Sequence, residues 1–223
     1  MSHALVLQHG DWGPPGVLGE WAAARGIEVA VHRADLAEPL PELNGQLFVA
    51  SLGAPQNPND THVPEVAAEL DFLERAVELE IPILGLCFGG QMLASILGST
   101  ITRAAEPELG WCMVSSTAPE LVAEGPWLQW HYDAFTLPPG AEQLAHSRVG
   151  VQAFAHGRHL GVQFHPESTI EIVGVWARMD QENLSALGID DGETLLESGR
   201  RHAAQAAAAA FDLFDAFWRR AQT

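Results

Sequence analysis

Two short segments of the chain carry side chains that could perform nucleophilic catalysis. Residues 85–91 read Gly-Leu-Cys-Phe-Gly-Gly-Gln and follow a continuous aliphatic run. Glycines around Cys87 allow a sharp turn from strand to helix, on which a nucleophile stands exposed and a helix N-terminus stabilises the thiolate. Most lone cysteines are buried structural residues, but glycines on both sides of such a junction favour a nucleophile here.

The second segment could supply the proton chemistry that a thiolate nucleophile requires. Residues 163–167 read Gln-Phe-His-Pro-Glu and also follow an apolar run. A histidine can protonate the leaving group, and a carboxylate can hold its imidazole in the required tautomer. His165 alone would be interpreted as a surface-loop histidine. Next to Glu167, across a proline that stiffens the turn, it predicts a Cys–His–Glu triad with Cys87.

Composition restricts the class of protein. The chain has 223 residues, 47% of them apolar, and a net charge of −18. We expect one folded domain over residues 1–223, with no affinity for nucleic acid or an anionic membrane. Two cysteines without metal-ligand spacing, no signal-peptide pattern and no long apolar run indicate a cytoplasmic protein. Two histidines in residues 156–159 are interpreted as part of a turn, so we expect no metal site.

Alternating apolar and amphipathic segments in the first half predict βαβ units. Such units give a parallel sheet between two layers of helices, which is a three-layer α/β/α sandwich. The expected strands are 4–8, 27–32, 47–51 and 81–86, with helices over 17–25 and 63–80.

The second half predicts an added antiparallel or mixed portion of the same sheet, closed by one helix. Its short apolar runs suggest strands joined by turns. The expected strands are 111–116, 121–123, 151–155 and 159–164, and the helix is 203–218, with Ala207, Phe211, Phe214 and Trp218 on its apolar stripe.

The two chemical motifs, in this order and 165 − 87 = 78 residues apart, resemble the class I (triad-type) glutamine amidotransferase family. The resemblance covers residues 4–175 and implies a flavodoxin-like sandwich with a mostly parallel sheet. Residues 108–111 and 130–138 are similar to segments of free-standing, single-domain members, which in turn resemble the glutaminase domain of GMP synthase. No glycine-rich ATP loop for a synthetase domain is present.

The resemblance implies further site residues. Residues 52–55 look like the family's Gly-Gly-Pro loop, so the N–H groups of Ala54 and Phe88 would form the oxyanion hole. Ala54 replaces the second glycine, and its β-carbon would be strained if that position needs a positive φ. Gly53 and Gln91 match positions that help to hold the substrate.

Two other residues have two interpretations each, and a third has one. His131 and Asp133 either line the pocket, with Asp133 reaching a substrate ammonium, or belong to a polar turn. Cys112 lies in an apolar run between Trp111 and Met113 and is expected in the core.

The predicted function is hydrolysis of glutamine to glutamate and ammonia through a Cys87 thioester, which requires no metal or organic cofactor. Whether ammonia passes to a separate synthetase is left open. Two alternatives remain: a γ-glutamyl peptide hydrolase with the same triad, and a non-catalytic regulatory or binding homologue. Intracellular proteases and chaperones with a similar cysteine turn have a histidine soon after the nucleophile. Here no histidine occurs between Cys87 and His131, which disfavours that class.

Replacement of each cysteine tests the nucleophile. Cys87→Ala should abolish amide turnover in a folded protein, because no other side chain in the two motifs can form the thioester. Cys112→Ala should retain most of the activity. Turnover and circular dichroism of both variants decide the matter, and the opposite pattern would show that the assignment to Cys87 is wrong.

Overall fold

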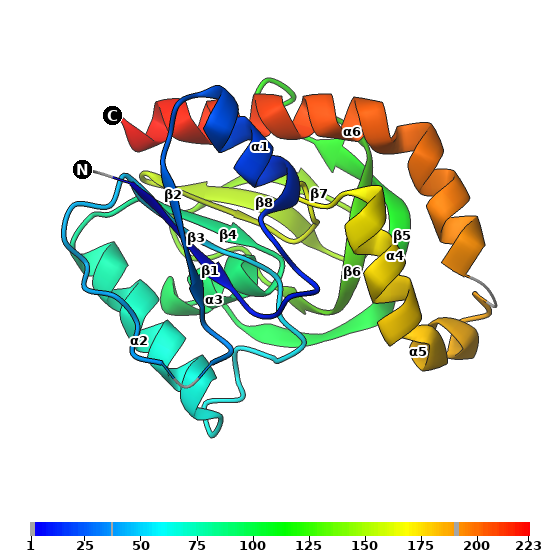
Figure 1. The fold of residues 1–223 in the computed structure, drawn as a ribbon, viewed down its shortest axis with the longest axis horizontal. Coiled ribbons are helices and arrows are strands. Elements are labelled where there is room, and N and C mark those ends of the chain that lie inside the picture. Colours follow the sequence, from blue (N-terminus) through cyan, green and yellow to red (C-terminus); the bar gives the residue numbers. More distant parts are fainter. Residues whose placement is uncertain (1–2, 37, 190–191) are drawn as a thin grey trace.

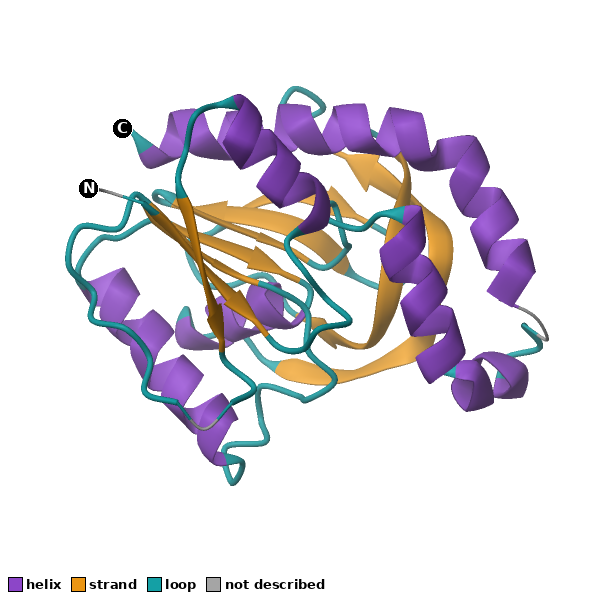
Figure 2. Ribbon diagram, in the orientation of Figure 1, coloured by secondary structure: helices purple, strands orange, loops and turns teal. Residues whose placement is uncertain are grey.

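Nine strands form one sheet, and helices cover both of its faces (Figures 1 and 2). The computed structural model describes residues 3–36, 38–189 and 192–223. Five neighbouring strands are parallel, and their spatial order is β2 (Val29–Arg33), β1 (Ala4–Gln8), β3 (Phe48–Ser51), β4 (Ile83–Leu86) and β9 (His159–Val162).

The sheet continues beyond β9 with antiparallel strands. In spatial order these are β8 (Val151–His156), β7 (Glu142–His146), β5 (Ile101–Ser116) and β6 (Gly125–Phe135). The predicted parallel sheet with an added antiparallel portion is therefore confirmed, and the antiparallel portion is longer than expected.

Helices on the two faces bury separate cores. α1 (Gly16–Ala24) and α6 (Gly192–Ala221) cover one face, and α2 (Pro64–Glu78) and α3 (Phe88–Ile96) cover the other (Figure 1). This arrangement confirms the three-layer, flavodoxin-like sandwich. Two further helices, α4 (Ile170–Met179) and α5 (Gln181–Ala186), follow β9, and α4 packs against aromatic residues of β5 and β6.

The closing helix α6 is longer than predicted, and its buried face is displaced. Phe214 is fully buried as expected, but the other deep positions are Ala210, Leu213 and Phe217. The helix packs against α1 as well as the sheet: the Phe214 ring lies 5.7 Å from that of Trp21. Because α6 packs against both α1 and the sheet, its buried face differs from the one that the sequence spacing suggests. The remaining expected positions, Ala207, Phe211 and Trp218, are only partly buried.

Several sequence predictions in the second half were incomplete or wrong. Residues 121–123 form no strand: the N–H groups of Leu121 and Val122 both bond to the carbonyl of Ala118 in a turn. Their apolar side chains pack into the core from that turn, which is why the run resembled a strand. The strand expected over 111–116 is the last part of β5, while β6, β7, α4 and α5 were not predicted.

No helix in the described part of the chain combines the length and the apolar character that crossing a membrane demands.

Candidate active site

Three neighbouring parallel strands end at the same edge of the sheet, and each is followed by a predicted site segment. Gly53 and Ala54 follow β3, Cys87 follows β4, and His165 follows β9. Carboxyl ends of parallel strands are where doubly wound folds bind ligands. The sheet order thus brings together segments that are far apart in the sequence.

The backbone of Cys87 is held in a strained turn. Its φ is 53° and its ψ is −107°, in a region that residues with a β-carbon rarely adopt. The glycines around it permit close backbone approaches. A β-carbon on Gly85 would lie 2.4 Å from the Gly89 carbonyl oxygen. A β-carbon on Gly89 would lie 2.1 Å from the Ser51 carbonyl oxygen, and one on Gly90 would lie 2.3 Å from the Val162 carbonyl oxygen. These contacts place the thiol at the N-terminus of α3.

His165 and Glu167 form a buried pair beside this turn. The distance from His165 Nδ1 to Glu167 Oε1 is 2.7 Å, and both residues are buried. Nε2 makes no hydrogen bond of ordinary geometry with a described residue. Burial alone would lower the pKa of His165, but the negative charges of Cys87 and Glu167 raise that pKa to about 10. The site therefore favours the protonated, imidazolium form of His165.

Two glycines let the backbone come close to this pair. The N–H of Val17 bonds to the carbonyl of Glu167 at 2.9 Å, and a β-carbon on Gly16 would lie only 2.1 Å from that oxygen. On the other side, a β-carbon on Gly53 would approach His165 Cε1 to 2.8 Å. Glycine at these positions is thus a condition for the placement of the histidine and the carboxylate.

The amides of Ala54 and Phe88 are available for an external acceptor. Neither donates a backbone hydrogen bond to any described residue. Among the described non-glycine residues, only Glu80 and Cys87 have a positive φ. Ala54 therefore carries no left-handed strain, and the replacement of glycine by alanine costs nothing of that kind.

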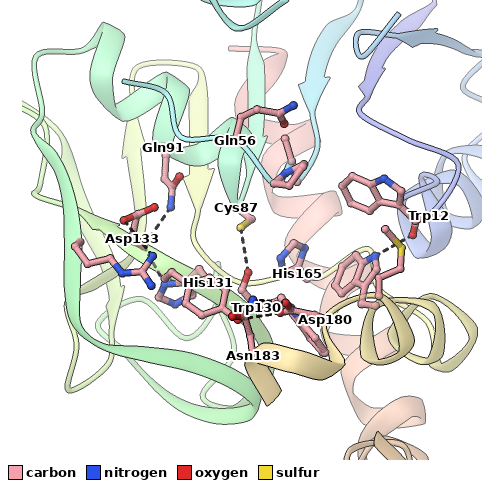
Figure 3. Close-up of a pocket in the computed structure, with 17 residues that line it drawn as sticks. Trp12, Gln56, Cys87, Gln91, Trp130, His131, Asp133, His165, Asp180 and Asn183 are labelled. Atoms are coloured by element: carbon pink, nitrogen blue, oxygen red, sulfur yellow. Dashed lines mark hydrogen bonds and ion pairs between the residues drawn. The ribbon is translucent and has the colours of Figure 1, made fainter. Parts of the chain in front are cut away.

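These residues open into a pocket of about 450 Å³ (Figure 3). All the predicted site residues except Phe88 and Glu167 line it. Its walls are Trp12, Gly53, Ala54, Pro55, Gln56, Cys87, Gln91, Arg103, Trp130, His131, Tyr132, Asp133, His165, Trp176, Met179, Asp180 and Asn183.

A chain of buried amides connects the thiol to β6. Gln91 Nε2 donates to the carbonyl of Asp133 and to Gln163 Oε1, each at 3.2 Å. Gln163 Nε2 lies 3.7 Å from Cys87 Sγ, within range of an N–H···S hydrogen bond. The sequence pattern indicated no role for Gln163 beyond its place in the second motif. Here it links Gln91 to the sulfur.

His131 and Asp133 lie on strand β6, so the interpretation as a polar turn was wrong. Both face the pocket (Figure 3). The His131 ring is buried and bonds to the Asp133 carbonyl at 2.9 Å and to the Glu108 carboxylate at 3.1 Å. The Asp133 carboxylate lies 3.9 Å from the Arg103 guanidinium.

An aromatic wall of the pocket was missed by sequence reasoning. The indole of Trp176 on α4 lies 4.6 Å from the His165 ring, edge to face, and donates to the Trp12 carbonyl at 2.9 Å. Asp180 accepts from Trp130 Nε1 at 2.9 Å and from the Tyr132 hydroxyl at 2.8 Å. The only sequence signal was the aromatic content of residues 130–138, because nothing in the pattern predicted α4.

Cys112 lies outside the strained turn that holds Cys87. It is half-buried on β5 rather than in the core, and its thiol lies 3.8 Å from the Leu109 carbonyl. Burial, together with the charge of Glu108, raises the pKa of the Cys112 thiol to about 11. It is therefore protonated at neutral pH and a poor nucleophile.

The described residues contain no group of three or more histidine, cysteine, aspartate or glutamate side chains that could hold a metal ion.

The chain is similar in sequence and in fold to known proteins. The family model for class I glutamine amidotransferases matches residues 20–174. A crystal structure of a glutamine amidotransferase from Thermotoga maritima superposes with a TM-score of 0.90 at 25% identity, covering 100% of this chain and 99% of that one. A glutamine amidotransferase-like protein of Salmonella typhimurium is 28% identical over 81% of this chain and 82% of its own length.

The glutamine-hydrolysing GMP synthase of Thermosynechococcus vestitus is 34% identical over 62% of this chain. That match covers 26% of the synthase, so the chain spans about a quarter of its length. Because the family model covers well over half of the sequence, this chain belongs to the class I glutamine amidotransferase family.

The coupling of His165 to Cys87 can be measured directly. Removal of the thiolate in Cys87→Ala should lower the pKa of His165, because one of the two charges that stabilise the imidazolium is lost. NMR titration of histidine-labelled protein measures this pKa, with His165→Asn to assign the resonance. Cys112→Ala is the matched control and should leave the pKa of His165 unchanged. An identical pKa in wild type and Cys87→Ala would contradict the coupling.

Proposed function

We propose that this protein hydrolyses the side-chain amide of glutamine, or of a closely related γ-glutamyl compound, through a thioester on Cys87. The observation that carries the proposal is the strained Cys87 turn beside a buried His165–Glu167 pair, together with two free amides: that of Ala54, which lines the pocket, and that of Phe88, which follows Cys87 directly. A nucleophile, a proton carrier that is held in one orientation and donors for an oxyanion are the three parts that acyl transfer requires.

In the first half of the reaction, the Cys87 thiolate attacks the Cδ carbon of the substrate amide. The carbonyl oxygen becomes an oxyanion between the N–H groups of Ala54 and Phe88. The His165 imidazolium gives its proton to the nitrogen, so that the C–N bond breaks and ammonia leaves. The product on the enzyme is a γ-glutamyl thioester.

The second half releases glutamate. Neutral His165 now takes a proton from water, and the resulting hydroxide adds to the thioester carbon. The C–S bond breaks, and the thiolate and the imidazolium are restored. Glu167 holds Nδ1 throughout, which leaves Nε2 to exchange protons. Neither step uses a metal or an organic cofactor.

The polar side of the pocket suits the amino-acid end of a glutamyl group. Asp133 carries the negative charge that would attract an α-ammonium, and Arg103 carries the opposite charge. Gln91 and Gly53 complete this side. Hydrogen bonds and ion pairs from these residues to the substrate would hold its amide carbon over the Cys87 sulfur. Such positioning supplies a large part of the catalytic effect in sites of this kind.

The aromatic wall supports a second candidate, γ-glutamyl peptide hydrolysis by the same residues. Trp12, Trp130, Tyr132 and Trp176 border the pocket, and such rings bind apolar groups larger than ammonia. The remaining alternative is a regulatory or binding protein in which the three residues of the triad perform no catalysis.

A synthetase partner would extend the proposal. The similarity to a glutamine-hydrolysing GMP synthase, most of which lies outside the match, supports transfer of ammonia to a separate chain. In that arrangement residues 1–223 act as one glutaminase domain.

A substrate screen tests the reaction and separates the two candidates. Purified protein is incubated with glutamine, with γ-glutamyl dipeptides and with a simple aliphatic amide, and ammonia and glutamate are measured separately. Glutamine should release both in equal amounts, while the aliphatic amide should react poorly because it lacks the groups that position the carbonyl. Faster cleavage of the dipeptides would select the second candidate. No turnover of any γ-glutamyl substrate would refute the proposed hydrolase.

Variants of the proton-transfer pair test the roles within the triad. His165→Ala removes general acid–base catalysis and should reduce turnover about 10²–10⁴-fold. Glu167→Gln keeps an acceptor for Nδ1 but loses the charge, so it should retain more activity than His165→Ala. Turnover is measured after each variant is shown to be folded. An active His165→Ala protein would be incompatible with the triad, and equal losses would assign an essential role to the Glu167 charge.

A further inference from the structure

A second buried polar cluster lies directly behind the loop after β3. His9 follows β1, Ser51 ends β3, and Glu69 comes from the middle of α2. His9 Nε2 is 2.6 Å from Glu69 Oε2, and the Ser51 hydroxyl donates to Glu69 Oε1 at 2.6 Å. All three residues are buried, Glu69 to 2% exposure. A carboxylate so deeply buried is costly unless its neighbours compensate it, so this cluster requires an explanation.

The other nitrogen of His9 contacts the peptide unit that carries one of the two free amides. His9 Nδ1 lies 3.2 Å from the carbonyl oxygen of Gly53. That carbonyl belongs to the same peptide group as the N–H of Ala54. The peptide is trans, so its C=O and N–H point in opposite directions. A bond that holds the carbonyl toward His9 therefore turns the Ala54 N–H away from it, toward the pocket that Ala54 lines.

The hydrogen-bond partners determine which atoms donate. A carbonyl oxygen can only accept, so Nδ1 must carry a proton. Glu69 already accepts from Ser51, and as a carboxylate it accepts from Nε2 as well. Burial alone would lower the pKa of His9, but Glu69 raises it above its ordinary value, with a smaller contribution from Asp35. Nδ1 therefore donates to the Gly53 carbonyl, and the raised pKa favours the form of His9 that is protonated on both nitrogens.

His9 also contacts the residue that carries the second free amide. Its ring lies 5.2 Å from the ring of Phe88, edge to face. Behind the cluster, the N–H of Gly89 bonds to the Leu52 carbonyl at 3.2 Å, which joins the loop to the start of α3. One buried side chain therefore touches both segments that supply the amides.

We propose that His9, anchored by Glu69 and Ser51, is a positioning residue for the oxyanion hole, because its Nδ1–H fixes and polarises the Gly53–Ala54 peptide. The inference rests on the proposed function. A donor on the carbonyl draws electron density from the peptide and makes the Ala54 N–H a stronger donor. The stronger Ala54 N–H donor stabilises the substrate only when the substrate carbonyl becomes an oxyanion. His9 should therefore affect kcat and leave KM unchanged.

Two substitutions separate the two nitrogens of His9. The amide nitrogen of His9→Asn takes the place of Nδ1 and can still bond to Gly53, whereas that of His9→Gln takes the place of Nε2 and can reach only Glu69. Loss of a whole oxyanion donor costs about 10²–10³-fold in kcat, so loss of its orientation in His9→Gln should cost about 10- to 100-fold. His9→Asn should stay within about threefold of wild type, because its side-chain amide still donates to the Gly53 carbonyl and so keeps the Ala54 N–H oriented.

The measurements are kcat and KM for glutamine, or for the γ-glutamyl dipeptide that the wild type cleaves fastest, and the rate at which iodoacetamide alkylates Cys87. Alkylation forms no oxyanion, so its rate should be the same in wild type and both variants. His146→Asn, an exposed histidine on β7, is the matched control, and thermal unfolding shows that every variant is folded.

Each outcome either supports or overturns the inference. A drop in kcat that is confined to His9→Gln, at constant KM and constant alkylation rate, supports it. Equal kcat in wild type and His9→Gln, equal losses in both variants, or slower alkylation overturns it while the proposed function stands. A wild-type protein that cleaves no γ-glutamyl substrate overturns the proposed function and, with it, this inference.

Discussion

The backbone of Cys87 has a φ of 53°, a conformation that costs a residue with a side chain about 1–3 kcal/mol. The surrounding structure must hold it there. The Cys87 N–H bonds to the Val162 carbonyl on β9, and the Cys87 carbonyl accepts from the Gln91 N–H in the first turn of α3. The three glycines of the turn admit backbone contacts that any β-carbon would prevent. This turn ties the thiol, the helix N-terminus and the neighbouring strand into one rigid unit.

The buried charges depend on that unit. His165 would lose its proton on burial if it were alone, but Cys87 and Glu167 raise its pKa far enough to keep an imidazolium at neutral pH. Each charge in such a group stabilises the others, and removal of one leaves a partner uncompensated. The aromatic contact from Trp176 excludes water from one side and strengthens these interactions. The same dry surroundings that make these charges costly would suit the ionic transition state of the proposed reaction.

Two carboxylates, the buried Glu69 and the half-buried Asp180, organise the regions on either side of the thiol. Glu69 anchors His9 behind the loop of Gly53, while Asp180 gathers the indole of Trp130 and the hydroxyl of Tyr132 at the outer wall. Glu69 comes from α2, and Asp180 lies at the junction of α4 and α5; none of these helices contributes a proposed catalytic group. Glu69 thus acts on the segment after β3, and Asp180 acts on side chains of β6. The pocket is thus shaped by the outer helices as much as by the sheet.

Much of the candidate site was readable from the sequence, because a cysteine on a strand–turn–helix junction and a His-Pro-Glu turn are local patterns. Residues 85–91 and 163–167 indicated the triad, and the alternation of strands and helices in the first half indicated the sandwich. Only the tertiary structure placed β4 beside β9, and with them Cys87 beside His165. It also decided that β6 is a strand. Its buried polar residues, such as Gln129, find partners on other strands, and no period in one segment reveals a partner elsewhere. For the same reason His9 gave no signal: its role depends on Glu69 and Gly53, which the chain brings close only when it folds.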